Sequence, residues 1–430
     1  MNMLSRSAPK QPFREELLDP LRRAMEVATL HQPLLAAWPE LVDCIDGLEL
    51  ERIYPRGERG FALEYRCGQR QILAELVGDR LTAYCDEAAH KLRHLPVSQS
   101  DQRQPLHPLA DLGLVLREPG IDHRLPLLGV INRPDQAEPL LASLLGTPVR
   151  VLTARLLAHR LGRRAVVRLR YLSGGSTQPQ SMIIKCYKGR SQRQLEVQRW
   201  LQALAPTPTG GDPRLRMVRP LACDGEHSVL LMEDVDGQPL DRLRGPALAA
   251  GVRDAGALLR RLQQSTLALP QLHRAEDELA LLQRWVPLTR ALFPALAAPL
   301  ERVWGRVERG LLRLPAAQPV LCHRDYYDKQ FIVSESHTVL LDLDTLCRAD
   351  PALDIGNFLA HMQLLELQRR GNAAPLWRAF HAGYGLERRA DPAAVTLYRM
   401  ASLLRLACIH AFWSRWKHLA LPLLEAADAA

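Results

Sequence analysis

Two stretches of the chain alternate apolar and polar residues in the manner of antiparallel strands. In the first, LELERIYP (48–55), FALEYRC (61–67) and QILAELVG (71–78) are separated by the turn RGERG and a Gly-Gln break. Alternation with a period of two, interrupted by turn residues, predicts a β-meander. The same order returns in VRVLTARLLA (149–158), AVVRLRYL (165–172) and SMIIKCY (181–187). A degenerate duplication and two unrelated meanders both explain this similarity.

Helical spacing dominates the rest of the chain. Residues 12–45 carry apolar side chains three and four positions apart, and so does RSQRQLEVQRWLQAL (190–204). From about residue 246 onward the pattern is mostly helical, and the one clear interruption is a predicted hairpin, FIV-SESHT-VLLDL (331–343). These periodicities predict a mainly β region followed by a mainly α region.

The division of the chain follows from this change of pattern. The polar, proline-bearing stretch PVSQSDQRQPLHP (96–108) is predicted to be a loop, and short apolar runs with several breaks follow it. We expect an N-terminal extension or cap at 1–146, a β-rich lobe at 147–236 and a helical lobe at 237–430. A β-rich lobe joined to a helical lobe by one short segment implies a cleft between them.

Composition narrows the class of protein. The 430 residues are 47% hydrophobic and 24% charged, which is typical of a globular protein, and no apolar run approaches the roughly 18 residues of a membrane helix. The beginning of the sequence lacks a signal-peptide core, and the eight cysteines form no C-x-x-C pair. We therefore expect a cytoplasmic protein with free thiols.

The net charge of +9 does not by itself indicate a nucleic-acid-binding protein. The excess of arginine is spread over the whole chain, and no helix-turn-helix, RNA-binding aromatic signature or zinc finger accompanies it. We expect no nucleic acid partner and no membrane association. The sequence leaves the oligomeric state open.

The stretch CHRDYYDKQFIV (322–333) gathers the candidate chemistry. Asp325 precedes the first strand of the predicted hairpin, Gln330 lies at the start of that strand, and the returning strand delivers Asp342. Closure of the hairpin brings two carboxylates and an amide oxygen to the same end, and such hard oxygen ligands suit Mg²⁺. Asp325, if it is not a ligand, is left to orient or deprotonate an attacking hydroxyl.

Upstream segments add parts of a nucleotide site. Lys185 lies in the apolar strand MIIKCY, where an isolated ammonium is costly unless it is paired. Glu196, eleven residues further on, lies on the next predicted helix, at a distance that would let it form a salt bridge with Lys185. HSVLLMEDVDG (227–237) is an apolar strand that ends in an acidic turn, suited to a hinge at Glu233 and Val235 whose backbone amides meet adenine.

Taken in order, these motifs resemble the aminoglycoside phosphotransferase/choline kinase-like family, the small-molecule branch of the protein-kinase-like fold. The resembling segments are MIIKCY, Glu196, LLMEDVDG, HRDYYDKQ, LLDLD and ADPALDIGNF, which together span roughly residues 148–365. The resemblance implies an α+β, bilobal fold with a β-rich N-lobe and a helical C-lobe. It also implies that Asp325 is the catalytic base, that Gln330 and Asp342 are metal ligands, and that Lys185 is the phosphate clamp.

Two further residues take structural roles by the same resemblance. His323 would brace the catalytic loop, and Asp354 would be a buried carboxylate that holds the following helix against it. Asp344 either supports the metal ligands without binding the metal itself or lies at an exposed strand end.

The chain departs from the family pattern at two places. Glutamine occupies position 330, where the family usually has asparagine; maltokinase-like members share the glutamine, which points toward a sugar-like acceptor. No glycine-rich phosphate loop is present, because HRLGRR (159–164) holds a single glycine. We interpret Arg160–Arg164 as a phosphate-facing turn.

The acceptor is expected to be a small molecule. Asp354 lies only twelve positions after Asp342, and no A-P-E signature follows. The chain therefore has no room for the long activation segment with which protein kinases bind a peptide.

The leading hypothesis is a phosphotransferase that uses ATP (or GTP) with Mg²⁺ to phosphorylate a hydroxyl of a small polar metabolite: a sugar, an aminoglycoside-like compound or an amino alcohol. The alternative is a pseudokinase-like nucleotide-binding or scaffold module, in which Gln330 and the reduced phosphate loop mark lost chemistry. A third hypothesis gives the function to the first ~145 residues, with the kinase-like part as their support.

Overall fold

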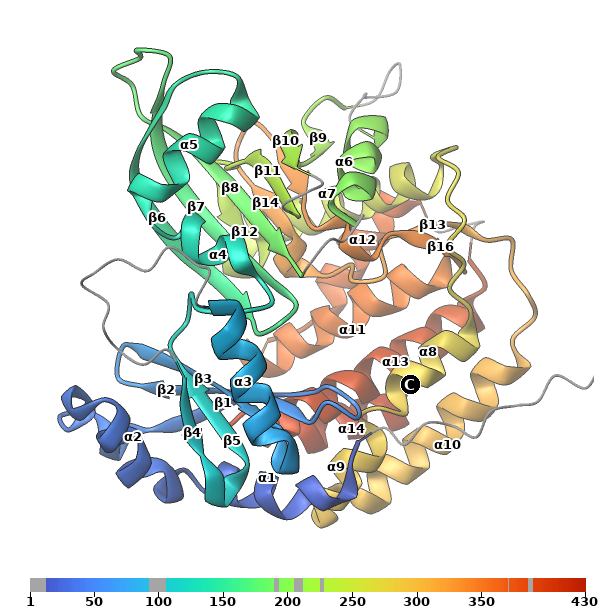
Figure 1. Cartoon of the computed structure of the whole chain (residues 1–430). Helices are drawn as coiled ribbons and strands as arrows, with labels where there is room; N and C mark the ends of the chain where they lie inside the picture. Colours follow the sequence, from blue (N-terminus) through green and yellow to red (C-terminus); the bar gives the residue numbers. More distant parts are fainter. Residues whose placement is uncertain are drawn as a thin grey trace, which may run out of the picture.

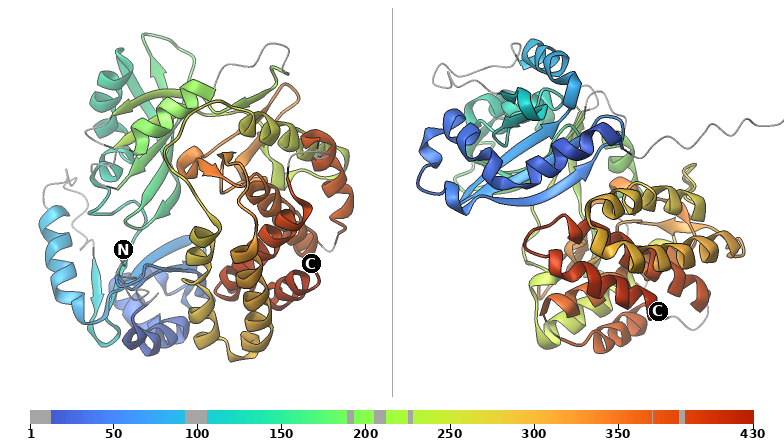
Figure 2. Two further views of the ribbon diagram at one scale, coloured as in Figure 1. Left: turned by 90° about the vertical axis from the view of Figure 1, so that its right-hand side faces the viewer. Right: turned by 90° about the horizontal axis from the view of Figure 1, so that it is seen from below.

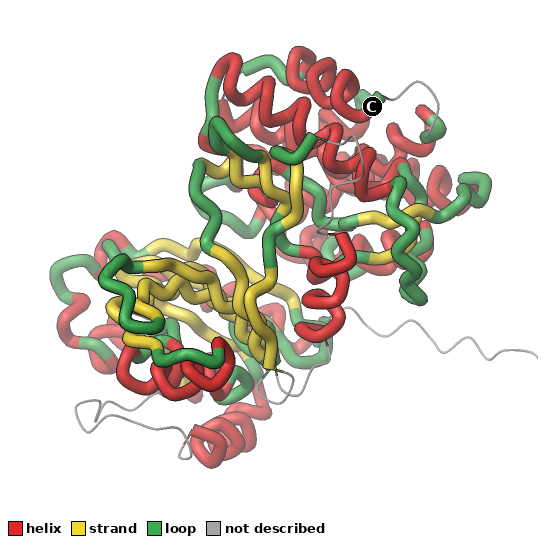
Figure 3. Tube along the Cα trace, turned by 90° about the horizontal axis from the view of Figure 1, so that it is seen from above, coloured by secondary structure: helices red, strands yellow, loops and turns green. Residues whose placement is uncertain are grey.

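The computed structural model divides the chain into three packed parts, a sheet with helices at the N-terminus, a second sheet and a large helical lobe (Figure 1). It describes residues 13–92, 106–188, 193–204, 212–224, 228–369, 371–385 and 390–430. Most of the predicted loop at 96–108 lies outside these residues. Seen from above, most of the strands lie on one side of the molecule with several helices beside them, and the helical lobe lies on the other side (Figure 3). This is the α+β, bilobal arrangement predicted from the sequence, with an additional N-terminal unit.

The N-terminal unit confirms the first predicted meander. Its antiparallel sheet has the order β1-β2-β3-β5-β4. The strands are β1 (Glu49–Pro55), β2 (Phe61–Cys67), β3 (Arg70–Leu76), β4 (His107–Leu109) and β5 (Leu114–Arg117). The helices are α1 (Leu18–Met25), α2 (His31–Ala37) and α3 (Leu81–Leu92), with the short 3₁₀ helices η1 (Glu15–Leu17), η2 (Val27–Leu30), η3 (Pro39–Leu41), η4 (Ile45–Gly47), η5 (Gly78–Arg80) and η6 (Ala110–Leu112).

The core of this unit continues into the helical lobe. Phe61, Leu63 and Tyr65 on β2 are buried, and the same apolar cluster includes Leu288 and Phe412 of the helical lobe. Figure 2 shows the N-terminal unit lying beside both other parts of the molecule. Burial of apolar surface drives such packing, so the N-terminal unit and the helical lobe share one hydrophobic core.

The second sheet confirms the second predicted meander. Its order is β10-β11-β8-β7-β6. The strands are β6 (Val149–Arg160), β7 (Arg164–Ser173), β8 (Gln180–Tyr187), β10 (Pro220–Asp224) and β11 (Val229–Glu233), and the helices around it are α4 (Pro126–Ile131), α5 (Pro134–Leu145) and α6 (Arg193–Leu204). Leu128 of α4 and Leu141 of α5 share a core with the strands of this sheet. The packing therefore divides the two units between β5 and α4, earlier in the chain than residue 146.

The two sheets share one connectivity. Each begins with a three-stranded meander, continues through a helix (α3 or α6), and ends with two antiparallel strands, of which the second pairs with the third strand of the meander. The short strand β9 (Leu215–Met217) follows α6 but belongs to a different sheet, where it pairs with β15 (Thr338–Leu340). This correspondence favours a duplicated β-lobe over two unrelated meanders.

The helical lobe carries the segments that form the cleft. Its helices are α7 (Gly245–Gln263), α8 (Ala275–Leu282), α9 (Val286–Leu292), α10 (Ala297–Arg313), α11 (Ala352–Arg369), α12 (Ala374–Tyr384), α13 (Pro392–Ala411) and α14 (Ala420–Asp428), with η7 (Leu240–Arg242), η8 (Pro294–Leu296), η9 (Asp328–Gln330), η10 (Leu343–Thr345) and η12 (Lys417–Leu419). Its short strands are β12 (Gln238–Pro239), β13 (Val320–Cys322), β14 (Phe331–Val333), β15 (Thr338–Leu340) and β16 (Cys347–Ala349). The predicted hairpin is β14–β15, and β9 pairs with β15 in parallel.

Helix α13 has the length and hydropathy of a membrane-spanning helix. Within the described part of the chain it is the one helix that meets this test, and 56% of its apolar window is buried inside the lobe. Packing within the helical lobe accounts for its apolar character.

Candidate functional site

The catalytic-loop segment places Asp325 and Gln330 in contact. The loop runs from β13 through η9 to β14, and Gln330 is buried at the end of η9. The side-chain amide of Gln330 donates to Asp325 Oδ2 at 3.1 Å. The backbone N–H of Leu341 donates to the backbone carbonyl oxygen of Gln330 at 2.8 Å. The second bond ties the loop to the strand that precedes Asp342, so hairpin closure fixes the two carboxylates relative to each other.

Asp342 lies just past β15 in an uncommon backbone conformation. Its φ of 56° is in the left-handed region, which few residues other than glycine adopt. The turn directs its carboxylate toward β8, where Oδ1 accepts from Lys185 Nζ at 2.8 Å. Strain of this kind gathers at functional sites, where the surrounding contacts enforce it.

Two carboxylates and two cations form a cluster between the lobes. Arg164, the first residue of β7, donates to Asp344 Oδ2 at 2.6 Å and lies 3.0 Å from Asp342 Oδ2. Lys185 also lies 3.3 Å from Asp344, and the hydroxyl of Tyr187 donates to the same carboxylate at 2.8 Å. Opposite charges in equal number offset the cost of removing each from water.

This cluster sets the protonation of its members. Burial alone would raise the pKa of the Asp342 carboxyl, but Lys185 and Arg164 outweigh it and hold that pKa well below its usual range. Burial and the neighbouring Asp344 raise the pKa of Tyr187, so its hydroxyl stays protonated and donates. Asp342 is therefore an ionised, oriented carboxylate at neutral pH.

A cavity of about 240 Å³ opens at this cluster. It is lined by Arg160, Arg163, Arg164, Tyr187, Asp325, Asp342, Asp344 and Thr345. The arginines come from the turn between β6 and β7, and the aspartates come from the catalytic loop and hairpin. The cavity thus faces cationic groups of one lobe toward carboxylates of the other.

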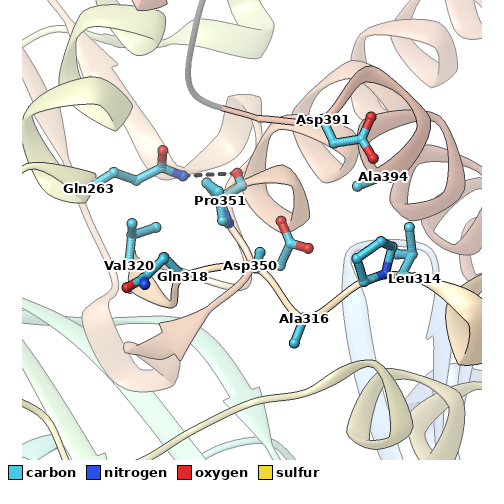
Figure 4. A pocket seen from close by; sticks show the side chains of 11 residues that line it. Gln263, Leu314, Ala316, Gln318, Val320, Asp350, Pro351, Asp391 and Ala394 are labelled. Atoms are coloured by element: carbon cyan, nitrogen blue, oxygen red, sulfur yellow. Dashed lines mark hydrogen bonds between the residues drawn. The ribbon is translucent and has the colours of Figure 1, made fainter.

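A larger cavity, of about 350 Å³, lies elsewhere in the helical lobe (Figure 4). Its carboxylates cap helices, because Asp350 Oδ1 accepts from the N–H of Ala352 at 2.8 Å and Asp391 Oδ1 from that of Ala393 at 3.0 Å. The Gln263 side chain donates to the Pro351 carbonyl at 3.0 Å. None of the site residues predicted from the sequence lines this cavity, so we assign the site to the smaller one.

Buried side chains hold the catalytic loop in place. The carboxylate of Asp354, at the start of α11, accepts from the backbone N–H groups of His323 at 2.6 Å and Arg324 at 2.7 Å. His323 Nε2 lies 2.9 Å from the Leu341 carbonyl oxygen, and Asn357 donates to the Tyr326 carbonyl at 3.0 Å. The geometry supports the bracing roles that the resemblance implies for His323 and Asp354.

Replacing Asp354 by alanine is expected to reduce the free energy of unfolding by about 3 kcal/mol, because two buried backbone donors lose a charged acceptor. The matched variant Asp391→Ala removes a single, exposed helix cap and should cost about 1 kcal/mol. Urea denaturation of the full chain measures both. Equal losses would show that Asp354 does not brace the loop.

The expected partner of Lys185 differs from the observed ones. Within the part of the chain that the structure describes, the carboxylates in ion-pair distance of Lys185 are those of Asp342 and Asp344, not that of Glu196. Glu196 lies on α6 and makes other contacts. Lys185 instead pairs with two carboxylates of the facing lobe, at 2.8 Å from Asp342 and 3.3 Å from Asp344.

The predicted hinge connects the two lobes. Glu233 ends β11, and its backbone N–H donates to the Arg219 carbonyl at 3.0 Å. Its carboxylate accepts from the backbone N–H of Arg219 at 2.7 Å and pairs with Arg216, so the side chain is fully used in local structure. Val235 is partly buried and packs against an apolar cluster that contains residues of both lobes. The side chain and the N–H of Glu233 are both engaged within the fold, so a nucleotide contact at Glu233 would use its backbone carbonyl.

The residues present fit a magnesium ion. Among the described residues, no cluster of three or more His, Cys, Asp or Glu side chains forms a ready-made metal cage. Magnesium bound with a nucleotide needs only one or two protein oxygens, because the phosphates and water supply the rest. Asp342 offers an ionised carboxylate and Gln330 an amide oxygen, which is a donor set of the required chemistry.

The comparison with protein families decides the class of the protein. Residues 162–398, more than half of the chain, match the model of the "Phosphotransferase enzyme family". The chain belongs to this family. The resemblance seen in its motifs is thereby confirmed, and the protein is a small-molecule phosphotransferase of kinase-like fold.

One solved structure supports the fold of this phosphotransferase, and others are also similar to the chain. A putative aminoglycoside phosphotransferase from Ralstonia eutropha JMP134 is 14% identical, with a TM-score of 0.51, covering 68% of this chain and 96% of that chain. A spectinomycin phosphotransferase in complex with ADP and spectinomycin is 14% identical with a TM-score of 0.49, and the match covers 69% of this chain and 99% of that chain. A choline kinase from Streptococcus pneumoniae is 15% identical with a TM-score of 0.45, and the match covers 69% of this chain and 97% of that chain. No curated protein matches the chain.

Sequence reasoning missed Tyr187, whose hydroxyl donates to Asp344 in the charge cluster. Tyr187 lies two residues after Lys185 on β8, so strand alternation puts both side chains on the same face, and this signal could have identified it. Of the two roles considered for Asp344, the exposed strand end is wrong, because its carboxylate contacts Arg164, Lys185 and Tyr187.

Proposed function

We propose that this phosphotransferase moves the γ-phosphoryl group of ATP, bound with Mg²⁺, to a hydroxyl group of a small polar metabolite. The observation that carries the proposal is the 240 Å³ cavity, where Asp325 and Asp342 face the arginines of the β6–β7 turn. Phosphoryl transfer asks the protein mainly to position the reactants and to neutralise charge, and this cavity offers groups for both.

The cations of the β-rich lobe are suited to the nucleotide phosphates. Lys185 is buried on β8, and Arg160, Arg163 and Arg164 surround the cavity from the turn. Burial lowers the pKa of Arg163, and the positive charges of neighbouring arginines lower it further, so an anion in the cavity would offset the repulsion between these arginines. The arginines of the turn would therefore bind the nucleotide phosphates through their charge, whereas a glycine-rich loop binds them through backbone N–H groups.

Asp325 is the proposed catalytic base. Its carboxylate lines the cavity, and the hydrogen bond from Gln330 fixes one of its two oxygens. A carboxylate so held orients the hydroxyl and takes its proton as the phosphoryl group moves. Gln330 and Asp342 would hold Mg²⁺, which supplies charge neutralisation at the phosphates when bound.

A small acceptor agrees with the course of the chain. After Asp342 the chain passes through η10 and β16 and enters α11 at Ala352, without a segment that could bind an extended peptide. The glutamine at position 330 supports a sugar-like hydroxyl acceptor within this class, as the resemblance to maltokinase-like proteins implies.

Mg²⁺-dependent stabilisation by ATP tests the proposal. At a ligand concentration a hundred times the dissociation constant, binding should stabilise the native protein by about 2.7 kcal/mol and raise its Tm. Asp342→Ala should abolish this Mg²⁺-dependent shift, because it removes the charged metal ligand. Thermal denaturation with and without ATP and Mg²⁺ measures the effect.

Glu335→Ala is the matched control. Glu335 is an exposed carboxylate at the tip of the same β14–β15 hairpin, so this variant should keep the full shift. If ATP with Mg²⁺ does not stabilise the unmodified protein, the proposed function is wrong.

A further inference from the structure

The turn between β6 and β7 is held from outside by the residues that precede the β-rich lobe. Asp122 Oδ2 accepts from the backbone N–H of Gly162 and lies 3.3 Å from His159 Nε2. Arg56, which follows β1 of the N-terminal unit, donates to the carbonyl of Leu161. Three groups in or beside the turn are therefore bound by residues that lie 37 to 105 positions earlier in the chain: the His159 ring, the Leu161 carbonyl and the Gly162 amide.

Asp122 is itself fixed in this position. It is buried, and its other oxygen accepts from the backbone N–H of Arg124 at 3.0 Å. The Nδ1 atom of His159 accepts from the N–H of Gly120 at 3.2 Å. Nδ1 must then be unprotonated, so the neutral ring carries its proton on Nε2 and donates it to Asp122. Both oxygens of Asp122 act as acceptors.

Gly162 is required for close approach in this turn. Its φ is +58°, and a Cβ atom at this position would lie 2.4 Å from Cζ of Arg124. The Arg124 guanidinium thus covers the turn at a distance that leaves no room for a side chain. The single glycine of HRLGRR permits a tight contact with a neighbouring element, whereas a glycine-rich loop would be free to move.

A buried charge network stands behind these contacts. Glu75 on β3 is paired with Arg56 at 2.8 Å, with Arg117 at 3.4 Å and with Arg124. Burial would raise the pKa of Glu75, but the three arginines lower it to about 2. Arg56 and Arg124, which contact the turn, are therefore anchored through one ionised carboxylate of the N-terminal sheet.

The same turn carries the arginines that line the candidate site. Arg160, Arg163 and Arg164 face the cavity, while Leu161 and Gly162 between them face Arg56 and Asp122. We propose that Asp122 is a positioning residue, through which the N-terminal part of the chain fixes the phosphate-facing turn for binding of the nucleotide. This inference rests on the proposed function and adds to it a role for the residues before the β-rich lobe.

Asp122→Asn tests the inference in the full chain. An amide nitrogen cannot accept and an amide oxygen carries no charge, so at least one of the donors on Gly162, His159 and Arg124 loses its partner, the remaining bonds weaken, and the turn is held less firmly. We expect the affinity for AMP-PNP with Mg²⁺, measured by calorimetry, to fall about tenfold, and amide hydrogen exchange in residues 158–165 to become faster.

A double-mutant cycle separates positioning from loss of stability. If Asp122 acts through the turn, Asp122→Asn should weaken AMP-PNP binding much less in an Arg163→Ala background, because the arginine that it positions is already absent. Independent, additive losses would contradict the inference. Asp79→Asn is the control, since Asp79 pairs with Arg14 on the exposed surface of the same unit, and it should bind AMP-PNP like the unmodified protein.

Arg56→Lys provides a second route if Asp122→Asn does not fold. Lysine keeps the positive charge beside Glu75 but lacks the guanidinium fork that also reaches Leu161. Binding weakened severalfold supports the inference, and unchanged binding with either folded variant overturns it. If the unmodified protein itself fails to bind AMP-PNP with Mg²⁺, the proposed function fails first, which is a distinct result.

Discussion

Replacing Asp325 by asparagine is expected to lower kcat for phosphoryl transfer about a thousandfold, because the proposed general base is lost. The asparagine oxygen can still accept the hydrogen bond from Gln330, so the loop should keep its conformation. Nucleotide affinity should change little, since the carboxylate acts on the acceptor hydroxyl rather than on the phosphates. Release of ADP over a panel of sugars, aminoglycosides and amino alcohols measures the effect.

The matched control for Asp325 is Glu335→Gln, which neutralises an exposed carboxylate outside the cavity and should leave kcat unchanged. Turnover that survives Asp325→Asn at the level of the unmodified protein would remove Asp325 from the proposed mechanism. The thermal unfolding of both variants should remain close to that of the unmodified protein, which separates loss of chemistry from loss of fold.

Gln330→Leu is expected to lower kcat about a hundredfold or more, because it deletes both the donor to Asp325 and the amide oxygen offered to Mg²⁺. Gln330→Asn keeps both groups on a stem one methylene shorter and should remain within about tenfold of the unmodified protein. The backbone of Gln330 is held by Tyr327 and Leu341, so neither variant should unfold the loop. The same ADP-release assay measures both.

This pair of variants also tests the alternative of a nucleotide-binding module without turnover. If the unmodified protein binds ATP with Mg²⁺, phosphorylates nothing in the panel, and gains activity through Gln330→Asn, the glutamine marks lost chemistry. Activity in the unmodified protein that Gln330→Leu leaves intact would instead show that the side chain has no part in the site.

The elements that rest on local sequence were predictable. Both meanders follow from alternation and turn residues, and the β14–β15 hairpin follows from two apolar runs around SESHT. Strands β9, β13 and β16 were not predicted, because three residues carry no readable period and their pairing depends on partners elsewhere in the fold. The association of α4 and α5 with the second sheet depends equally on tertiary packing.

The contacts of the candidate site also fall into those that local sequence predicts and those that depend on the tertiary fold. A tight hairpin alone brings Asp325, Gln330 and Asp342 together, so their proximity could be inferred from spacing. The partners of Lys185 could not be inferred in this way. Asp342 lies 157 positions later in the sequence, whereas Glu196, the partner that the sequence suggested, lies only eleven positions later. The contact of Asp122 with Gly162 joins two segments that show no complementary pattern in the sequence.

The N-terminal unit touches both lobes, and this has a mechanical consequence for the cleft. On one side it binds the β6–β7 turn; on the other, the Arg52 guanidinium lies 4.5 Å from the centre of the Trp413 ring, and Ser414 donates to the Leu50 carbonyl. The lobes are thus joined by the chain after Glu233 and by the pairing of β9 with β15, and the N-terminal unit contacts both of them as well. Such a frame restricts rigid-body opening to small excursions, so exchange of the acceptor should proceed through local side-chain and loop motion, and turnover should depend little on solvent viscosity.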